Sequence, residues 1–182
     1  MEQHQITVQM ALDAGFTNAG HLDLQQVAFR PEVRDMCADN LCHKYGTSWV
    51  CPPGCGSLEE VAAFIQSFDY GMLLQVTGTL QNSFDMVSID AIQEKCRQNL
   101  KGFLANLRAN GHQVRGMSTA HCELCETCTY PDAPCRFPDQ KAPSLEACGM
   151  VVSDECTRAG IEYYYGPNTM TFTVAILVNE TK

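Results

Sequence analysis

Cysteine is the residue that most restricts what this chain can fold into and bind. The 182 residues include 11 cysteines, and eight of them fall into two tight groups. The first group is Cys37, Cys42, Cys51 and Cys55, and the second group is Cys122, Cys125, Cys128 and Cys135. Such groups serve as disulfide frameworks, as metal ligands or in catalysis, and the rest of the sequence must decide among these uses.

The first residues carry no secretory signal. The segment MEQHQITVQM has neither a positively charged start nor a continuous apolar run. No apolar stretch in the chain approaches the roughly 20 residues that span a bilayer. The sequence therefore predicts a cytoplasmic protein that does not bind a membrane. Thiols stay reduced in the cytosol, so a metal protein is favoured over a disulfide scaffold.

Acidic residues outnumber basic residues by 21 to 12, which gives a formal net charge of −9. A field of this sign repels phosphate groups, so nucleic acid is a poor partner. An apolar fraction of 45% is enough to fill a hydrophobic core. We therefore expect one domain over residues 1–182, with a redox partner protein or a small molecule as its ligand and an oligomeric state that the sequence leaves open.

Hydrophobic periodicity predicts both helices and strands. Apolar residues recur at intervals of three and four over residues 89–107, and they alternate over residues 169–178. Ser57 and Glu60 form a capping box, which starts a helix that ends before Tyr70. The other expected elements are strands at 6–12, 72–79, 113–117 and 161–165, and helices at 22–36 and 144–158.

This order of elements predicts an α/β fold, with α+β as the alternative. Strands that are interleaved with long helices form a central sheet flanked by helices. The two cysteine-rich loops, residues 37–55 and 122–135, would then lie at strand ends, where cofactors bind.

The second cysteine group has three cysteines at intervals of three, and Cys135 follows after a proline-rich segment. Three thiolates in close succession can bind one face of an iron–sulfur cube, whereas one zinc ion usually takes cysteine pairs from two separate knuckles. The segment between Cys128 and Cys135 is long enough to return the fourth thiol to the same cube. The spacing favours a [4Fe-4S] cluster, with zinc or idle thiols as alternatives. Arg136 would offset the cluster's negative charge or form a surface salt bridge.

The first cysteine group is irregularly spaced, and its loop is bent by glycines and prolines. Irregular spacing fits a second [4Fe-4S] cluster or a zinc ion. Four thiolates would close the site, whereas three would leave an iron open to substrate. The role of Cys55 therefore decides between an electron carrier and a catalyst. Tyr45 and Trp49 lie in the same loop and would shield a cluster from water or simply pack.

The other three cysteines, Cys96, Cys148 and Cys156, are predicted to be buried core thiols. His43 and His121 adjoin grouped cysteines and are interpreted as solvent-facing loop residues, with metal ligation or hydrogen bonding to sulfur as alternatives. The sequence contains no paired-carboxylate signature, phosphate-binding glycine loop or nucleophile elbow, so hydrolysis without a cofactor has no support.

Taken together, the two cysteine groups resemble one protein family. The motifs are Cys37-x4-Cys42-x2-Tyr45-Gly46-x2-Trp49-x-Cys51-Pro52-Pro53 and Cys122-x2-Cys125-x2-Cys128-x-Tyr130-Pro131-Asp132-x-Pro134-Cys135-Arg136-Phe137-Pro138. They are similar to those of the predicted metal-binding proteins called domain of unknown function 2284, and Gly15-Phe16 and the segment 144–147 extend the likeness. The resemblance implies metal binding by these cysteines in a small bacterial or archaeal protein, often from an anaerobe, and implies no settled reaction.

Three functions follow from the sequence. The first is a cytoplasmic protein with two [4Fe-4S] clusters, which passes single electrons from a low-potential donor to a partner enzyme. The second is a redox enzyme in which the cluster of Cys37, Cys42 and Cys51 keeps an open iron. The third is an interaction module that zinc stabilises and that has no redox role.

Overall fold

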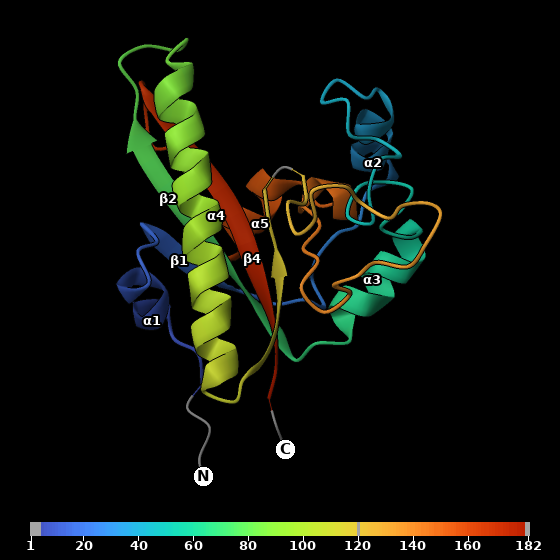
Figure 1. The fold of residues 1–182 in the computed structure, drawn as a ribbon. Helices are drawn as coiled ribbons and strands as arrows, with labels where there is room; N and C mark the ends of the chain where they lie inside the picture. The colour runs from blue at the N-terminus through green and yellow to red at the C-terminus, as the bar shows by residue number, and fades with distance from the viewer. Residues whose placement is uncertain (1–4, 120, 181–182) are drawn as a thin grey trace.

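The computed structural model describes residues 5–119 and 121–180, and within them the strands form one four-stranded antiparallel sheet (Figure 1). The strand order is β1-β2-β4-β3. The strands are β1 (Asn18–Leu22), β2 (Tyr70–Thr79), β3 (Gln113–Met117) and β4 (Thr169–Asn179). Strands β2 and β4 pair over ten residues, from Tyr70 opposite Val178 to Thr79 opposite Thr169. This long central pair is the frame on which the other elements are placed.

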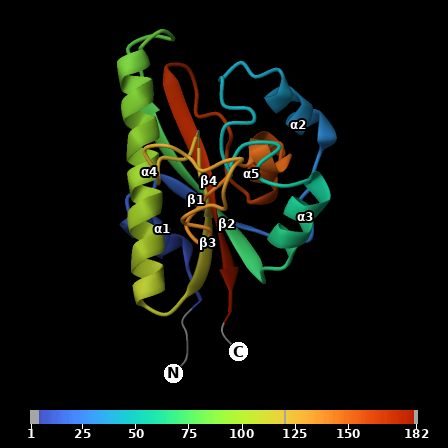
Figure 2. The same cartoon turned by 45° about the vertical axis from the view of Figure 1, so that its right-hand side comes forward.

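Helices cover both faces of the sheet (Figures 1 and 2). One face packs against α1 (Val8–Asp13) and the long α4 (Met86–Ala109). The opposite face packs against α3 (Leu58–Gln66), the short 3-10 helix η1 (Glu146–Cys148) and α5 (Val152–Arg158). Helix α2 (Pro31–Ala38) has no buried residue and contacts η1 instead of the sheet. The predicted class, a mixed α/β fold with helices on both faces of a sheet, is confirmed.

Side chains along β4 point alternately to the two faces of the sheet, so the hydrophobic core has two parts. Val174, Ile176 and Val178 are buried against α4, whereas Ala175 and Leu177 are buried on the α3 and α5 side. Successive side chains of a strand point to opposite faces, so a strand buried on both faces is apolar throughout. The predicted alternation over residues 169–178 is therefore confirmed.

Two predicted strands are wrong. Residues 8–13 form helix α1, which begins after Thr7 because the Thr7 hydroxyl accepts a hydrogen bond from the Met10 backbone N–H. Residues 161–165 form a loop, which the buried side chain of Gln75 holds through hydrogen bonds to the Glu162 carbonyl and from the Tyr165 hydroxyl. In both segments a specific side-chain hydrogen bond fixes a conformation that the apolar pattern did not reveal.

Two predicted helices are shorter in the structure. The segment 22–36 becomes helical only at Pro31, a residue that favours the first turn of a helix. The segment 144–158 is interrupted at Gly149, whose φ of +80° ends η1 before α5 begins. Strand β1 was not predicted. The elements from α3 to β3 lie close to their predicted positions, and Ser57 and Glu60 form the expected capping box.

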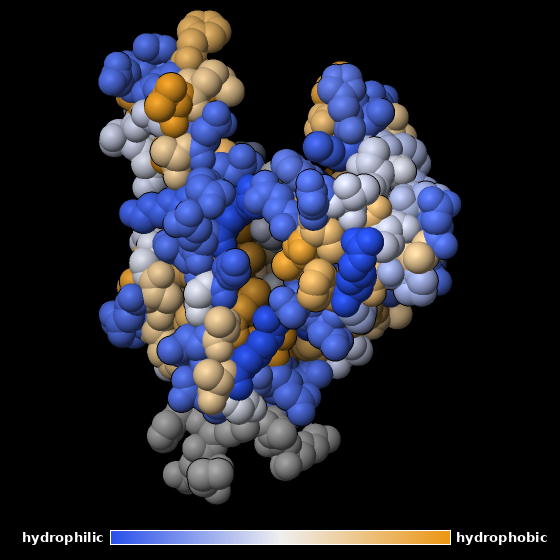
Figure 3. Space-filling model, in the orientation of Figure 1, coloured by the Kyte–Doolittle hydropathy of each residue, from blue (hydrophilic) through white to orange (hydrophobic). Residues whose placement is uncertain are grey.

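The surface is largely hydrophilic on the face shown in Figure 3. Apolar side chains are exposed at the turn from β2 into α4, where Phe84, Met86 and Val87 lie. More apolar residues line a hollow between α4 and the second cysteine loop (Figure 3). Within the described ranges, no helix has the length and apolar character needed to cross a membrane.

Candidate metal centre

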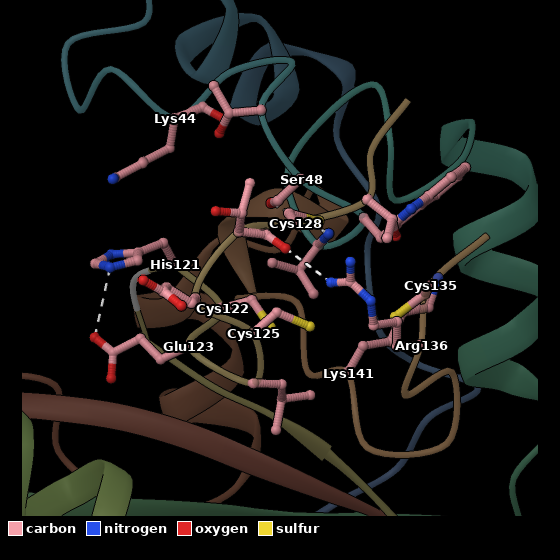
Figure 4. A pocket seen from close by; sticks show the side chains of 17 residues that line it. Lys44, Ser48, His121, Cys122, Glu123, Cys125, Cys128, Cys135, Arg136 and Lys141 are labelled. Carbon is pink, nitrogen blue, oxygen red and sulfur yellow. Dashed lines mark hydrogen bonds and ion pairs between the residues drawn. The ribbon is translucent and has the colours of Figure 1, made fainter. Parts of the chain in front are cut away.

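The second cysteine group lines one side of a pocket of about 400 Å³ (Figure 4). Its four thiols, Cys122, Cys125, Cys128 and Cys135, all border this space. Residues 122–135 contain no helix or strand, as the prolines predicted. Hydrogen bonds from the Arg136 guanidinium to the Thr127 carbonyl and from the Thr129 hydroxyl to the Pro134 carbonyl fold the loop back on itself. This folding brings the fourth thiol into the same pocket as the first three.

The opposite wall of this pocket comes from the first cysteine loop, through residues 44 and 47–50. The Trp49 indole N–H donates a hydrogen bond to the Ala133 carbonyl at 3.0 Å. A Cβ added at Gly54 would lie 2.8 Å from the Tyr130 ring, so the glycine permits the close approach of the two loops. The two cysteine loops, distant in sequence, therefore pack directly against each other.

The thiols of the second group influence one another electrostatically. Burial raises the pKa of Cys122, and the charges of Cys135, Cys128 and Cys125 raise it further. A hydrogen bond from the Leu124 backbone opposes these effects. Several thiolates in one pocket repel each other unless a cation neutralises them, and a bound metal is the cation that deprotonates thiols outright.

Basic side chains border the same pocket. Lys44, Arg136 and Lys141 line it, and none of the three forms an ion pair with a carboxylate among the residues the structure describes. Lys141 lies 5.9 Å above the centre of the Trp49 ring. Figure 4 shows Arg136 beside Cys135, on the side of the pocket opposite Lys44 and His121. Glu123 and Glu126 also line the pocket, so three cations stand against two carboxylates there. In a chain of net charge −9, this small local excess of cations fits an anionic thiolate–metal centre.

The histidines adjoining the cysteine groups lie at the surface. His43 and His121 are exposed, as expected. His121 contacts Glu123 at 3.5 Å, and its pKa is lowered by partial burial and by the charges of Lys44 and Arg97. His121 therefore binds a proton less readily than an isolated histidine does.

The first cysteine group surrounds the end of α2. Cys37 lies in the last turn of this helix, Cys42 is exposed in the following loop, and Cys51 begins a tight turn. The Cys55 backbone N–H donates to the Cys51 carbonyl and closes that turn. Burial raises the pKa of Cys37, as do the charges of Glu146, Cys42 and Cys51, whereas the charge of Arg34 lowers it. The joint binding of a metal by the four thiols of the first group stays a prediction.

Cys55 also borders a second pocket, of about 380 Å³. This pocket lies between the first loop, α3 and the sheet, and much of its lining is apolar. Cys148 borders the same space, and the Cys55 thiol donates a hydrogen bond to the Ala147 carbonyl at 3.6 Å. Trp49 and Lys141 line both pockets. The two pockets are therefore neighbours that share one aromatic and one cationic wall.

Sequence reasoning missed Arg34. One guanidinium nitrogen, Nη2, donates to the Gly56 carbonyl at 2.7 Å, and the other, Nη1, is buried with no hydrogen-bond partner in the described part of the chain. The Arg34 charge lowers the pKa values of Cys37 and Cys55 against the larger effect of burial. The available signal was its position one helical turn before Cys37.

The remaining cysteines are buried, as predicted. Cys96 lies in the core beneath α4, and its thiol donates to the Phe172 carbonyl at 3.6 Å. Cys156 accepts a hydrogen bond from the Gln75 side chain. Cys148 is 1% exposed. Over residues 5–119 and 121–180, no three His, Cys, Asp or Glu side chains are placed to hold a single metal ion.

The sheet and its two thiol-lined loops define the class of the protein, which is a mixed α/β protein with the grouped cysteines typical of metal-binding proteins. The chain belongs to the DUF2284 family, described as predicted metal-binding proteins, whose model matches residues 20–178. All 11 cysteines lie within that range. Comparison with curated proteins and with solved structures gives no match. The resemblance noted from the two motifs is thus confirmed.

Proposed function

We propose that this protein is a cytoplasmic iron–sulfur protein that binds two [4Fe-4S] clusters and passes single electrons to a partner enzyme. Cys122, Cys125, Cys128 and Cys135 would hold one cluster, and thiols around α2 would hold the other. A cluster of this type supplies one-electron redox chemistry. One electron would enter from a reduced low-potential redox protein and one would leave to an oxidised partner, with no atom transferred.

The observation that carries this proposal is the four-thiol pocket whose far wall is the other cysteine loop. Two centres held in loops that pack against each other are suited to exchange electrons. Trp49 and Tyr130 join the two loops through their ring contact and the hydrogen bond from the indole. The cations at Lys44, Arg136 and Lys141 would offset the negative charge of a cluster ligated by four thiolates.

The test is the metal content of anaerobically purified protein. We expect about eight irons and about eight sulfides per chain, with a broad brown absorption band that dithionite bleaches. Cys128→Ser should lose about half of the iron, whereas Cys96→Ser, a buried thiol outside both groups, should lose none. Colourless protein with stoichiometric zinc would refute the redox proposal and leave the zinc-stabilised module.

A second candidate function is a redox enzyme, which the apolar pocket beside Cys55 favours. Ligand pockets are mostly apolar with few polar groups, and this one has Lys141 and the Cys55 thiol on its wall. An open iron at the first centre would bind cyanide, so cyanide would change the electron paramagnetic resonance signal of that centre alone. A carrier with both centres closed would show no change.

A further inference from the structure

Cys148 lies outside both sequence motifs, yet the fold places it against the first cysteine loop. Helix η1, which ends at Cys148, packs against α2. The Arg30 backbone N–H donates to the Gly149 carbonyl at 2.7 Å, which fixes η1 at the start of α2. The hydrogen bond from the Cys55 thiol to the Ala147 carbonyl fixes the other side of η1. Cys148 is thus held between the segment that carries Cys37 and the turn that carries Cys55.

Four thiols lie on the segments that meet around η1. Cys37 lies in the last turn of α2, which packs against η1, and Cys148 ends η1. Cys51 and Cys55 lie in one turn, and the Cys55 thiol donates to the Ala147 carbonyl beside Cys148. Cys42 is exposed to solvent. Four thiolates are the number that closes a metal centre.

The Arg34 side chain lies beside the turn that carries Cys55, because its Nη2 donates to the Gly56 carbonyl at 2.7 Å. Its charge acts on Cys37, Cys55 and Cys148, and its buried Nη1 lacks a hydrogen-bond partner within the described residues. A buried guanidinium donor without an acceptor is costly, and an anionic group is its natural partner. A thiolate–metal centre bounded by these cysteines would supply that acceptor.

We infer that Cys148 is a thiolate ligand of the first metal centre, together with Cys37, Cys51 and Cys55. The inference rests on the proposed function only in that a metal is bound there, and it holds for an iron–sulfur cluster or for zinc. It also gives a reason for a fully buried thiol to border the same pocket as Cys55. Burial raises the pKa of a free thiol at this position, and a metal would reverse that effect.

The experiment is a comparison of metal content between Cys148→Ser and Cys156→Ser after anaerobic reconstitution of the full chain. Both thiols are fully buried in the same apolar cluster, so the two variants are matched in burial. Iron, sulfide and zinc are all counted per chain. We expect Cys148→Ser to lose about half of the wild-type metal and Cys156→Ser to lose none. Full metal content in Cys148→Ser would overturn the inference.

Cys148→Ala separates ligation from packing, because alanine suits an apolar core but cannot bind metal. We expect Cys148→Ala to lose the same centre while the circular dichroism of the sheet and helices is retained. A Cys148→Ala variant that keeps all its metal would show that Cys148 is only a core thiol. Cys42→Ser, in the exposed position, should keep both centres.

The wild-type measurement distinguishes the two proposals. If the wild type binds zinc alone, the iron–sulfur proposal fails, and the Cys148 comparison is made on zinc. If the wild type binds two clusters and Cys148→Ser also binds two, only the ligand inference fails.

Discussion

The ring of Trp49 meets the ring of Tyr130 edge-on, with centroids 5.0 Å apart and planes at 88°. Trp49 belongs to the first cysteine loop and Tyr130 to the second, so this contact joins the two loops. The indole N–H adds a hydrogen bond to Ala133, three residues beyond Tyr130. Two segments without regular structure are thereby held in one arrangement by an aromatic pair and a single hydrogen bond.

The aromatic contact should be measurable as a coupling energy. Edge-to-face pairs contribute about 0.5–1.5 kcal/mol beyond their buried area. We expect a double-mutant cycle of Trp49→Leu and Tyr130→Leu, followed by urea unfolding, to give a coupling free energy in this range. If the losses of unfolding free energy in the two single variants simply add in the double variant, the rings do not stabilise each other.

Gly54 should tolerate no side chain. An added Cβ would overlap the Ser48 carbonyl oxygen and lie 2.8 Å from the Tyr130 ring. We expect Gly54→Ala to lower the free energy of unfolding by about 1–3 kcal/mol, because the loops must separate. Gly102→Ala is the control, since a Cβ there meets nothing within 4 Å. That helix substitution should raise stability by about 0.5–1 kcal/mol. Equal effects of the two substitutions would contradict this account.

Arg34 should change the reduction potential of the proposed first cluster and leave that of the proposed second cluster unchanged. A positive charge beside a redox centre stabilises the reduced, more negative form, so its removal lowers the reduction potential. We expect Arg34→Met to lower the potential of one centre in a redox titration followed by electron paramagnetic resonance, and to leave the other unchanged. Arg30→Met is the matched control, because Arg30 forms a half-exposed ion pair with Asp154 at 3.3 Å. A shift of both potentials in Arg34→Met would count against a local role.

Glu155 should make folding stability depend on pH. Its carboxyl group is fully buried, one oxygen accepts from Arg158 at 2.6 Å, and the other has no partner among the residues described. Burial raises its pKa above the ordinary value of 4.5, although Arg158 opposes the shift. The folded state therefore binds this proton more tightly than the unfolded state does. The stabilisation is present below the pKa that Glu155 has in the unfolded chain. It is lost as pH rises through the pKa that Glu155 has in the folded protein.

We therefore expect Glu155 to make the free energy of unfolding of the wild type fall as pH rises above the ordinary carboxyl pKa of 4.5, and Glu155→Gln to remove that part of the slope. Urea titrations at several pH values measure it. Asp90→Asn, at an exposed position on α4 whose charge does not act on Glu155, should keep the wild-type slope. An unchanged slope in Glu155→Gln would assign the pH dependence to other groups.

The sequence predicted best those elements whose signals are local. The capping box of Ser57 and Glu60 located the start of α3, and the long apolar stripe located α4. Helix α1 was mistaken for a strand because six residues are too few to separate a period of two from one of 3.6. Strand β1 was missed because its Gly20 packs against the backbone of Ala159, a contact that depends on the tertiary fold.

The candidate site likewise has features that local sequence signals predicted and features that depend on the tertiary fold. Spacing was enough to group eight cysteines into two loops, and their role as ligands stays a prediction. The packing of Trp49 on Tyr130 and the burial of the Arg34 guanidinium against Gly56 required the folded chain. Cys148 looked like an ordinary core residue, because nothing in its local sequence indicates that η1 packs against α2.

Strand β4 occupies a central position in the sheet, although it is the last strand along the chain. Both cysteine loops precede it, so during synthesis they leave the ribosome before β2 and β3 have the partner that lies between them. Chains are made from the N-terminus, and a sheet built on long-range pairs assembles late. The thiols are therefore exposed in an incomplete fold until β4 is in place, and this interval is when oxygen or a wrong metal would do most harm.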